Sequence, residues 1–187
     1  MEALGDLPGG FFDSRANAVA ENSYTVVGRG LSASGQEACR WLAGGSPIGL
    51  GDLPGGAFQS EAFGVSADGS VIVGYGTSAS GKEAFRWQGG VMTGLGDLDG
   101  GQFLSQALAV SADGGTIVGT AYDATGSAAM IWTQAQGMRK LQDVLAGSVP
   151  SGWRLTVATA ISANGRYIVG YGYNPSGFRE AFRAALY

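Results

Sequence analysis

The sequence contains no histidine among its 187 residues, and this absence removes several kinds of chemistry. Histidine is the commonest general acid or base, it completes the Ser-His-Asp triad, and it is a frequent zinc ligand. Cysteine occurs once, as Cys39, which excludes an internal disulfide and a CxxC site. The sequence therefore predicts no resident metal or cofactor, and an enzyme built on this chain would have to work without histidine.

Charge and long apolar segments are also scarce. Only 14% of the residues are charged, with 11 basic against 15 acidic, whereas a nucleic-acid-binding protein needs a basic surface that neutralises phosphates. No apolar run approaches the roughly 18 residues of a membrane-spanning helix. We therefore expect neither a nucleic-acid partner nor a membrane span.

The first residues, 1–6, lack the charged start and the apolar centre of a signal peptide. They match a phrase that recurs inside the chain, so we expect a mature sequence from which a leader has been removed. The cellular location must then be inferred from other features.

Glycine, in contrast, supplies 34 residues, about 18% against a usual share of roughly 7%. Much of it lies in phrases that recur along the chain. A Leu-Gly-Asp-Leu phrase returns in steps of 46, 45 and 46 residues, a Val-Gly phrase returns with it, and so does a Glu-Ala-Phe-Arg-Trp phrase. The Leu-Gly-Asp-Leu phrase begins at Leu4, Leu50, Leu95 and, in degraded form, Leu141. The chain therefore consists of four copies of one unit.

Each copy has the pattern of a four-stranded antiparallel meander. In the second copy, residues 60–66, 70–76, 82–87 and 91–98 contain alternating or β-branched residues suited to strands. Short turns rich in Gly, Asp and Ser separate these segments. Sustained helical periodicity is absent, because glycine recurs every five or six residues and costs about 1 kcal/mol inside a helix.

Four-stranded units of about 45 residues are typical of β-propeller blades. We predict one all-β domain over residues 1–187, a four-bladed β-propeller. Its blades are expected at residues 14–53, 60–98, 105–144 and 156–187, the last completed by residues 1–7. Pairing of this N-terminal strand with the C-terminal blade would close the ring and remove the open edges. A parallel β-solenoid is the alternative, although its coils usually repeat at roughly 20–30 residues.

The phrases LGDLPGG, VSADGSxIVG and Gly-x-x-Ala-Phe-x-Trp together resemble the HAF repeat family of bacterial extracellular proteins. The resemblance spans all four copies and is strongest in residues 50–87. It implies secretion or surface exposure and a propeller-like fold, and it transfers no catalytic residue. The family is named for a His-Ala-Phe triplet, whose first position is Glu37, Glu83 and Glu180 here. A family role that depends on imidazole is therefore in doubt for this chain.

Recurring polar residues are best interpreted as structural. An aspartate before a Pro-Gly-Gly turn can accept hydrogen bonds from backbone amides and fix the connection between blades. A ring of hydroxyls is expected near the axis, where a serine nucleophile would lack a base. The aspartates are Asp6, Asp52, Asp97 and Asp143, and the hydroxyl residues are Ser14, Ser60, Ser105 and Thr156.

Function is expected where the copies differ, because shared features serve the fold. The connections from fourth to first strands should share one face with the loops between second and third strands. Aromatic rings beside polar groups suit sugars or flat small molecules, although some of these rings could simply fill the mouth of a small propeller. The predicted binding residues are Phe12, Phe58, Phe103, Trp153, Arg154, Tyr173, Arg29 and Gln106.

We therefore predict a secreted or cell-surface monomer that binds a small molecule or a carbohydrate at this face. The first alternative is a histidine-free lyase, isomerase or cyclase. The second alternative is a structural surface repeat protein without a ligand. For the enzyme, a tyrosine would exchange a proton, an arginine would stabilise an oxyanion and a carboxylate would act as base. The candidate catalytic residues are Tyr75, Tyr122, Tyr171, Arg15, Glu61 and Asp13.

Overall fold

Short β-branched segments and glycine-containing turns give a chain that is almost entirely β-structure, with 55% of residues in strands and 2% in a helix. The structure is a computed structural model that describes residues 1–21 and 24–186. The predicted all-β fold is confirmed. Tyr187, the last residue of the predicted fourth blade, lies outside the described residues.

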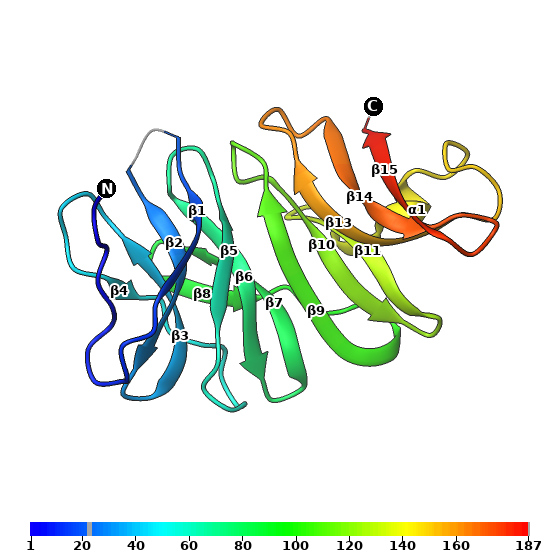
Figure 1. The fold of residues 1–187 in the computed structure, drawn as a ribbon. Coiled ribbons are helices and arrows are strands. Elements are labelled where there is room, and N and C mark those ends of the chain that lie inside the picture. The colour runs from blue at the N-terminus through cyan, green and yellow to red at the C-terminus, as the bar shows by residue number, and fades with distance from the viewer. Residues whose placement is uncertain (22–23, 187) are drawn as a thin grey trace.

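The strands fall into four successive units, numbered here from the N-terminus (Figure 1). Unit 1 contains β1 (Arg15–Val19), β2 (Val26–Ser32), β3 (Gly35–Trp41) and β4 (Ile48–Gly49). Unit 2 contains β5 (Glu61–Val65), β6 (Val71–Ser78), β7 (Gly81–Gln88) and β8 (Val91–Gly94). Unit 3 contains β9 (Gly100–Val110), β10 (Thr116–Asp123), β11 (Gly126–Thr133) and β12 (Gly137–Lys140). The one-turn helix α1 (Leu141–Val144) precedes unit 4, which contains β13 (Arg154–Ile161), β14 (Tyr167–Tyr173) and β15 (Arg179–Ala185).

Units 1 to 3 are antiparallel meanders of four strands, and unit 4 has three. A parallel bridge between Lys82 and Leu104 joins β7 to β9, so units 2 and 3 form one eight-stranded sheet. Strand bounds differ from the prediction by one or more residues in several strands, and the differences in units 2 and 3 are clear examples. The fourth strand of unit 2 ends at Gly94 instead of residue 98, and β9 starts at Gly100 because Gly100 pairs with Asp123.

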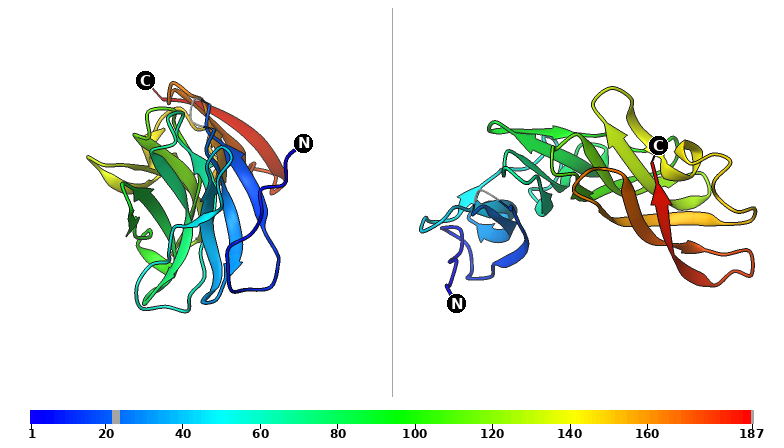
Figure 2. Two further views of the ribbon diagram at one scale, coloured as in Figure 1. Left: turned by 90° about the vertical axis from the view of Figure 1, so that its left-hand side faces the viewer. Right: turned by 90° about the horizontal axis from the view of Figure 1, so that it is seen from above.

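The units follow one another along an arc, with the N-terminal and C-terminal units at opposite ends (Figures 1 and 2). The first strands of successive units contact one another in the order β1, β5, β9 and β13. None of the sheets formed by the described residues is closed. The arrangement is therefore an open series of sheets in this structure.

The predicted pairing of residues 1–7 with the C-terminal blade is not observed. These residues lie against unit 1 instead, where the Trp41 Nε1–H donates to the Gly5 carbonyl at 3.3 Å. The Leu31 N–H donates to Asp6 Oδ1 at 3.2 Å, and the Leu7 side chain is buried with Trp41. These contacts hold the segment at its own end of the arc, far from β15 (Figure 1).

The described residues form four hydrophobic core clusters, and three of them are each shared by two successive units. Val27 of unit 1 packs with Ile72 and Phe85 of unit 2. Val73 of unit 2 packs in the same way against unit 3, and Val118 of unit 3 packs against Ile168 of unit 4. Burying a side chain of this kind contributes about 1.5–3 kcal/mol, so packing between sheets stabilises the arc.

The recurring Val-Gly phrase is explained by a bulge in the first strand of each unit. In unit 2 the register of β5 against β6 shifts between Ala62 and Gly64. A Cβ atom added at Gly74 would overlap the carbonyl oxygen of Glu61, because β5 lies so close to β6 there. Glycine is therefore required by a close backbone approach.

We predict that Gly74→Ala destabilises the protein by at least about 2 kcal/mol, because the methyl group must displace the β5 backbone. Urea unfolding followed by circular dichroism measures this change. Gly45→Ala is the matched control: Gly45 has no positive φ, and its added Cβ would lie 3.5 Å from the nearest atom, the Leu42 oxygen. A loss of equal size in both variants would contradict the explanation.

Candidate functional site

The two loop sets that were expected to share one face lie side by side in units 1 and 2. The connection into unit 1 touches the β2–β3 loop through a bridge between Gly9 and Ser32. In unit 2 the equivalent bridge joins Gly55 and Ser78. We call the surface formed by residues 8–14, 31–35, 54–60 and 77–81 the loop face.

Two of the recurring aspartates, Asp6 and Asp52, fix this face through hydrogen bonds from the backbone. Asp52 Oδ1 accepts hydrogen bonds from the N–H groups of Leu53 at 2.8 Å and Thr77 at 3.0 Å. Its Oδ2 accepts from the Gln59 N–H at 2.6 Å. Asp6 makes the corresponding three bonds in unit 1. These contacts support the structural interpretation made from the sequence.

We predict that Asp52→Ala lowers the free energy of unfolding by about 3 kcal/mol, because three backbone donors lose a charged acceptor. Asp52→Asn should cost less, since its amide oxygen can still accept. Asp99→Ala, at an exposed aspartate in the next connection, should change stability by less than about 0.5 kcal/mol. Chemical denaturation measures all three, and an Asp52→Ala variant as stable as Asp99→Ala would refute the prediction.

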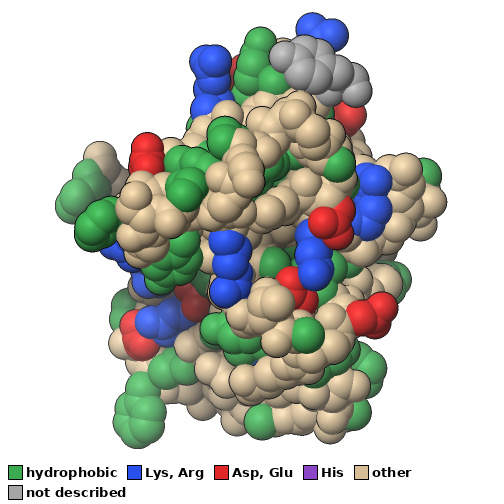
Figure 3. Space-filling view, turned by 90° about the vertical axis from the view of Figure 1, so that its right-hand side faces the viewer, with side chains coloured by type: hydrophobic (Ala, Val, Ile, Leu, Met, Phe, Trp, Pro, Cys, Tyr) green, Lys and Arg blue, Asp and Glu red, His purple; other side chains and the backbone are tan. Residues whose placement is uncertain are grey.

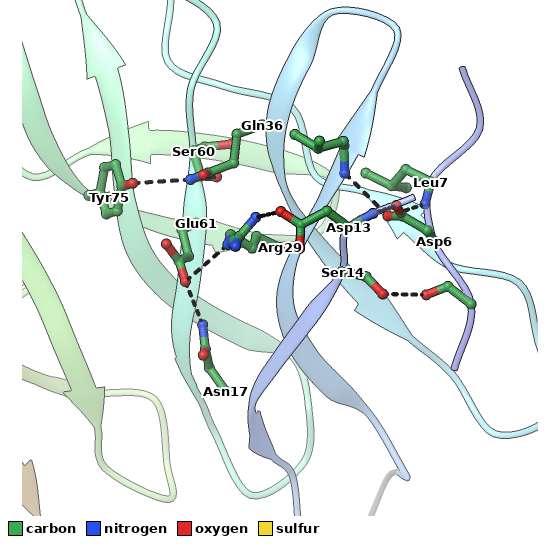
Figure 4. Close-up of polar contacts among 12 residues, drawn as sticks. Asp6, Leu7, Asp13, Ser14, Asn17, Arg29, Gln36, Ser60, Glu61 and Tyr75 are labelled. Atoms are coloured by element: carbon green, nitrogen blue, oxygen red, sulfur yellow. Dashed lines mark hydrogen bonds and ion pairs between the residues drawn. The ribbon is translucent and has the colours of Figure 1, made fainter. Parts of the chain in front are cut away.

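A charged cluster lies beside the loop face, at the boundary between units 1 and 2 (Figure 4). Arg29 Nη1 lies 3.0 Å from Asp13 Oδ2, and Arg29 Nε lies 3.9 Å from Glu61 Oε1. Asn17 donates to Glu61 Oε1 at 3.0 Å and to the Ala62 carbonyl at 2.8 Å. We call Asp13, Asn17, Arg29 and Glu61 the Arg29 cluster.

The Arg29 cluster is closed at one end and open at the other. The side chain of Glu61 is 10% exposed, that of Arg29 is 20% exposed, and that of Asp13 is 54% exposed. The hydrogen bond to Asp13 is the main cause that raises the pKa of Arg29, so its charge is fixed at any ordinary pH. A ligand could therefore reach this cluster from the Asp13 side.

Tyr75 lies next to the cluster, since it pairs with Glu61 across β5 and β6. Its hydroxyl accepts a hydrogen bond from Gln36 at 3.1 Å, and Lys82 Nζ lies 3.6 Å from the centre of its ring. Burial raises the pKa of Tyr75 and lowers that of Lys82. Tyr75 thus stays a neutral phenol near pH 7, which makes it a poor proton acceptor.

The structure brings together three of the six candidate catalytic residues, namely Asp13, Glu61 and Tyr75. Arg15 is close in the strand register, opposite Arg29, but its side chain is exposed. Tyr122 lies in unit 3 and Tyr171 in unit 4, so neither belongs to the cluster. The tyrosines expected to share one pocket are therefore distributed over three units.

The predicted binding residues are also distributed. Arg29 belongs to the cluster, while Phe12 is 82% exposed and Phe58 is 38% exposed on the loop face. The others lie further along the arc: Phe103 and Gln106 in β9, Trp153 beside unit 4, Arg154 in β13 and Tyr173 in β14. Arg154 is engaged by the structure itself, since its Nη2 donates to the Ser127 carbonyl at 3.0 Å.

Sequence reasoning missed Asn17, Gln36 and Lys82, which contact the cluster or Tyr75. None of them recurs in every copy. The contacts of Asn17 and Gln36 cross the boundary between units 1 and 2, whereas Lys82 contacts Tyr75 within unit 2. No local pattern could have identified Gln36 and Asn17, because their partners lie 39 and 44 residues away. The one indication in the sequence is that the four copies have different residues at these positions.

A second ion pair was also missed, between Lys140 and Asp123 at 2.7 Å. Both residues line a hollow of about 350 Å³ between units 3 and 4, together with Thr125, Asp143 and Arg154. The hydrogen bonds from Lys140 and Thr125 lower the pKa of Asp123 to about 2. Because this value lies below the ordinary value of about 4, the carboxylate contributes stability that is complete above pH 4 and is lost as the pH falls toward 2.

We predict that Lys140→Met raises the pKa of Asp123 toward its ordinary value, so that acid destabilisation begins at a higher pH. Carboxyl-carbon NMR titration measures the pKa, and urea unfolding at pH 7, 4 and 2 measures stability. Lys82→Met, at the other lysine of the chain, should leave Asp123 unchanged. An unaltered Asp123 titration in Lys140→Met would show that the ion pair does not hold the pKa down.

Residues 1–21 and 24–186 contain neither a metal-ligand cluster nor a membrane-spanning helix. No group of three or more Cys, Asp or Glu side chains in this part of the chain could hold a metal ion. The described helix is too short to cross a membrane.

No protein-family model matches the sequence, and the search of curated proteins found no match. Solved structures do resemble it. A putative TolB from Agrobacterium tumefaciens superposes with a TM-score of 0.64 at 15% identity, covering 96% of this chain and 69% of that one. TolB from Acinetobacter baumannii gives a TM-score of 0.59 at 13% identity, covering 92% and 43%. At these identities the likeness shows a TolB-like all-β fold alone, and this chain spans only part of either structure.

Proposed function

We propose that this protein binds a carbohydrate or another small polar ligand at the loop face of units 1 and 2. The observation that carries this proposal is the position of the Arg29 cluster beside exposed phenyl rings. Phe12 adjoins Asp13, the open end of the cluster, and Phe11 is 89% exposed next to it. Phenyl faces can stack on a sugar ring while the charged groups bind its hydroxyls.

A shallow hollow supports the same location. It has a volume of about 480 Å³ and is lined by residues 9–11 and 31–35, with Phe11 at its edge. Such a volume suits a small ligand, although the hollow is open rather than enclosed. The single free thiol, Cys39, is buried elsewhere, and burial raises its pKa to about 12, so it offers no nucleophile near this face.

Binding is favoured over the alternative of a histidine-free enzyme. The carboxylates of Asp13 and Glu61 are both engaged by Arg29, and Tyr75 is buried and neutral. A general base must be free to take a proton from the substrate within hydrogen-bond reach. The alternative of a structural surface repeat protein predicts no ligand at the loop face, and the binding experiment below separates it from our proposal.

We also propose that the units are propeller blades and that the protein is secreted or on the cell surface. The TolB-like fold supports the first statement and is compatible with an extracellular or cell-envelope location. The resemblance to the HAF repeat family supports both and stays a prediction. A closed four-bladed ring also stays a prediction, since it would require residues 1–7 to leave unit 1 and pair with β15.

We predict that Phe12→Ala/Phe58→Ala weakens ligand binding about tenfold, because two stacking faces of about 0.7 kcal/mol each are removed. A glycan array would identify the ligand, and calorimetry would measure its affinity for wild type and variants. Phe178→Ala is the matched control, since Phe178 is 70% exposed at the opposite end of the arc. Absence of binding to any glycan or small polar ligand, or an equal effect of the control, would overturn the proposal.

A further inference from the structure

Five positions at the boundary between units 3 and 4 hold residue types that the other two boundaries do not use. At those two boundaries the same positions hold a serine, a glutamate, two glycines and a phenylalanine. They are Ser32, Glu37, Gly49, Gly51 and Phe58 at the first boundary, and Ser78, Glu83, Gly94, Gly96 and Phe103 at the second. In the same order, the residues at the boundary of units 3 and 4 are Asp123, Ala128, Lys140, Gln142 and Arg154. All five line the hollow of about 350 Å³ between these units, which we call the Arg154 hollow.

The Arg154 hollow lies where a side chain fills the space in the other units. In unit 2, Glu83 lies so close to Gly94 that a Cβ atom added to this glycine would overlap the carboxylate. Unit 3 has Ala128 in place of the glutamate and Lys140 in place of the glycine. Lys140 Nζ lies 2.7 Å from Asp123 Oδ2. The exchange therefore removes one carboxylate, opens space and adds a positive charge.

The recurring aspartate has a different role at this boundary. The Leu155 N–H donates to Gln142 Oε1 at 3.1 Å, as the Gln59 N–H donates to Asp52 Oδ2 at 2.6 Å. Gln142 has thus taken over a contact of the aspartate. Asp143 itself lies in α1 with an exposed side chain, and among the described residues no group donates a hydrogen bond to its carboxylate. The structural role expected for Asp143 is therefore not observed, and its carboxylate is free to accept hydrogen bonds at the edge of the hollow.

Arg154 carries a charge that no described carboxylate balances. It stands at the position of Phe58 and Phe103, it is half-buried, and its Nη2 donates to the neutral Ser127 carbonyl at 3.0 Å. Within the described part of the chain it forms no ion pair with an Asp or Glu side chain. A guanidinium has five N–H donors in a planar fork that matches the two oxygens of a carboxylate. Arg154 therefore has donors left for an anionic ligand.

Lys140 supplies further donors to the same hollow. Its ammonium has three N–H groups, of which Asp123 needs one, and its side chain is 37% exposed. The hydrogen bond to Asp123 raises the pKa of Lys140, whereas the positive charge of Arg154 acts in the opposite direction. The two cations are therefore close enough to repel each other, and an anion that contacts both would be attracted by both.

The backbone next to Arg154 is held in place by unit 3. The Thr156 carbonyl accepts hydrogen bonds from Thr120 Oγ1 at 3.0 Å and from Ser127 Oγ at 3.1 Å. Leu155, between Arg154 and Thr156, is buried in the cluster that units 3 and 4 share. A site on such a fixed strand loses little conformational freedom when a ligand binds.

We propose that the Arg154 hollow binds a small organic carboxylate, which is a sugar acid or an amino acid. Its carboxylate contacts Arg154 and Lys140, and its hydroxyl or amine donor contacts Asp143. The hollow lies between units 3 and 4, apart from the loop face of units 1 and 2. This second site thus goes beyond the proposed function and does not depend on it.

Size and surface charge favour a small anion over a long polyanion. The volume of about 350 Å³ lies at the lower end of the range for small-molecule sites, roughly 300–1,000 Å³. Seen from the side that carries unit 4, acidic and basic side chains of the described residues lie next to one another, without a continuous basic patch (Figure 3). A polyanion such as a nucleic acid needs a continuous patch of this kind, and the chain has a net charge of −4.

Isothermal titration calorimetry of the wild-type chain tests the proposal. Glucuronate and galacturonate represent the sugar acids, glutamate and aspartate represent the amino acids, and glucose is the neutral control. We expect one class of acid to bind at least about tenfold more tightly than glucose, because only the acids offer a carboxylate to Arg154. The class that binds identifies the ligand chemistry. Absence of binding by all four acids, or equal binding of glucose, would overturn the proposal.

Substitutions then locate the bound carboxylate. Arg154→Phe restores the residue type of the other two boundaries and should fold, which urea unfolding checks, but it should weaken acid binding at least about tenfold. Asp143→Ala should weaken binding about fivefold, because the ligand loses one acceptor. Arg166→Phe, at an exposed arginine of the β13–β14 turn, is the matched control and should bind as wild type does. A folded Arg154→Phe variant with wild-type affinity, or an equal loss in the control, would contradict the proposal.

The variant designed for the loop face separates the two sites. Phe12→Ala/Phe58→Ala leaves the Arg154 hollow unchanged, so it should bind the acid with wild-type affinity. Loss of acid binding in this variant would place the ligand at the loop face instead and would overturn the second site.

Discussion

The contact between successive units is the constraint on which the rest of the structure depends. A single meander would leave a hydrophobic face exposed to water and would therefore be unstable. It buries that face against a neighbouring unit. Val27, Val73 and Val118 carry out this role and are fully buried. The aspartate and serine hydrogen bonds of the connections then fix each unit at a set position relative to the next.

This dependence on neighbours explains how the candidate site forms. The Arg29 cluster forms because β1 and β5 contact each other, which brings Asn17 and Arg29 to Glu61.

Features that every unit needs lie outside the candidate site, and features of the site differ between units. Asp52 and Ser60 bind backbone groups, and so do Asp6, Asp97, Ser14 and Ser105. The positions of Asp13 and Arg29 hold other residue types in the other copies. Asp13 and Arg29 form an ion pair that is partly open to solvent. Divergence between copies therefore separates chemistry from architecture in this fold.

The sequence by itself determined the all-β fold, the repeat period, the short turns and the structural role of Asp6, Asp52 and Asp97, because each depends on local periodicity or on contacts within one repeat. It also placed Asp13, Arg29, Glu61 and Tyr75 on one face. The tertiary structure alone decided that residues 1–7 stay on unit 1, that Asn17 reaches Glu61, and that Lys140 pairs with Asp123. These outcomes depend on the angle and spacing between packed units, which hydrophobic periodicity does not encode.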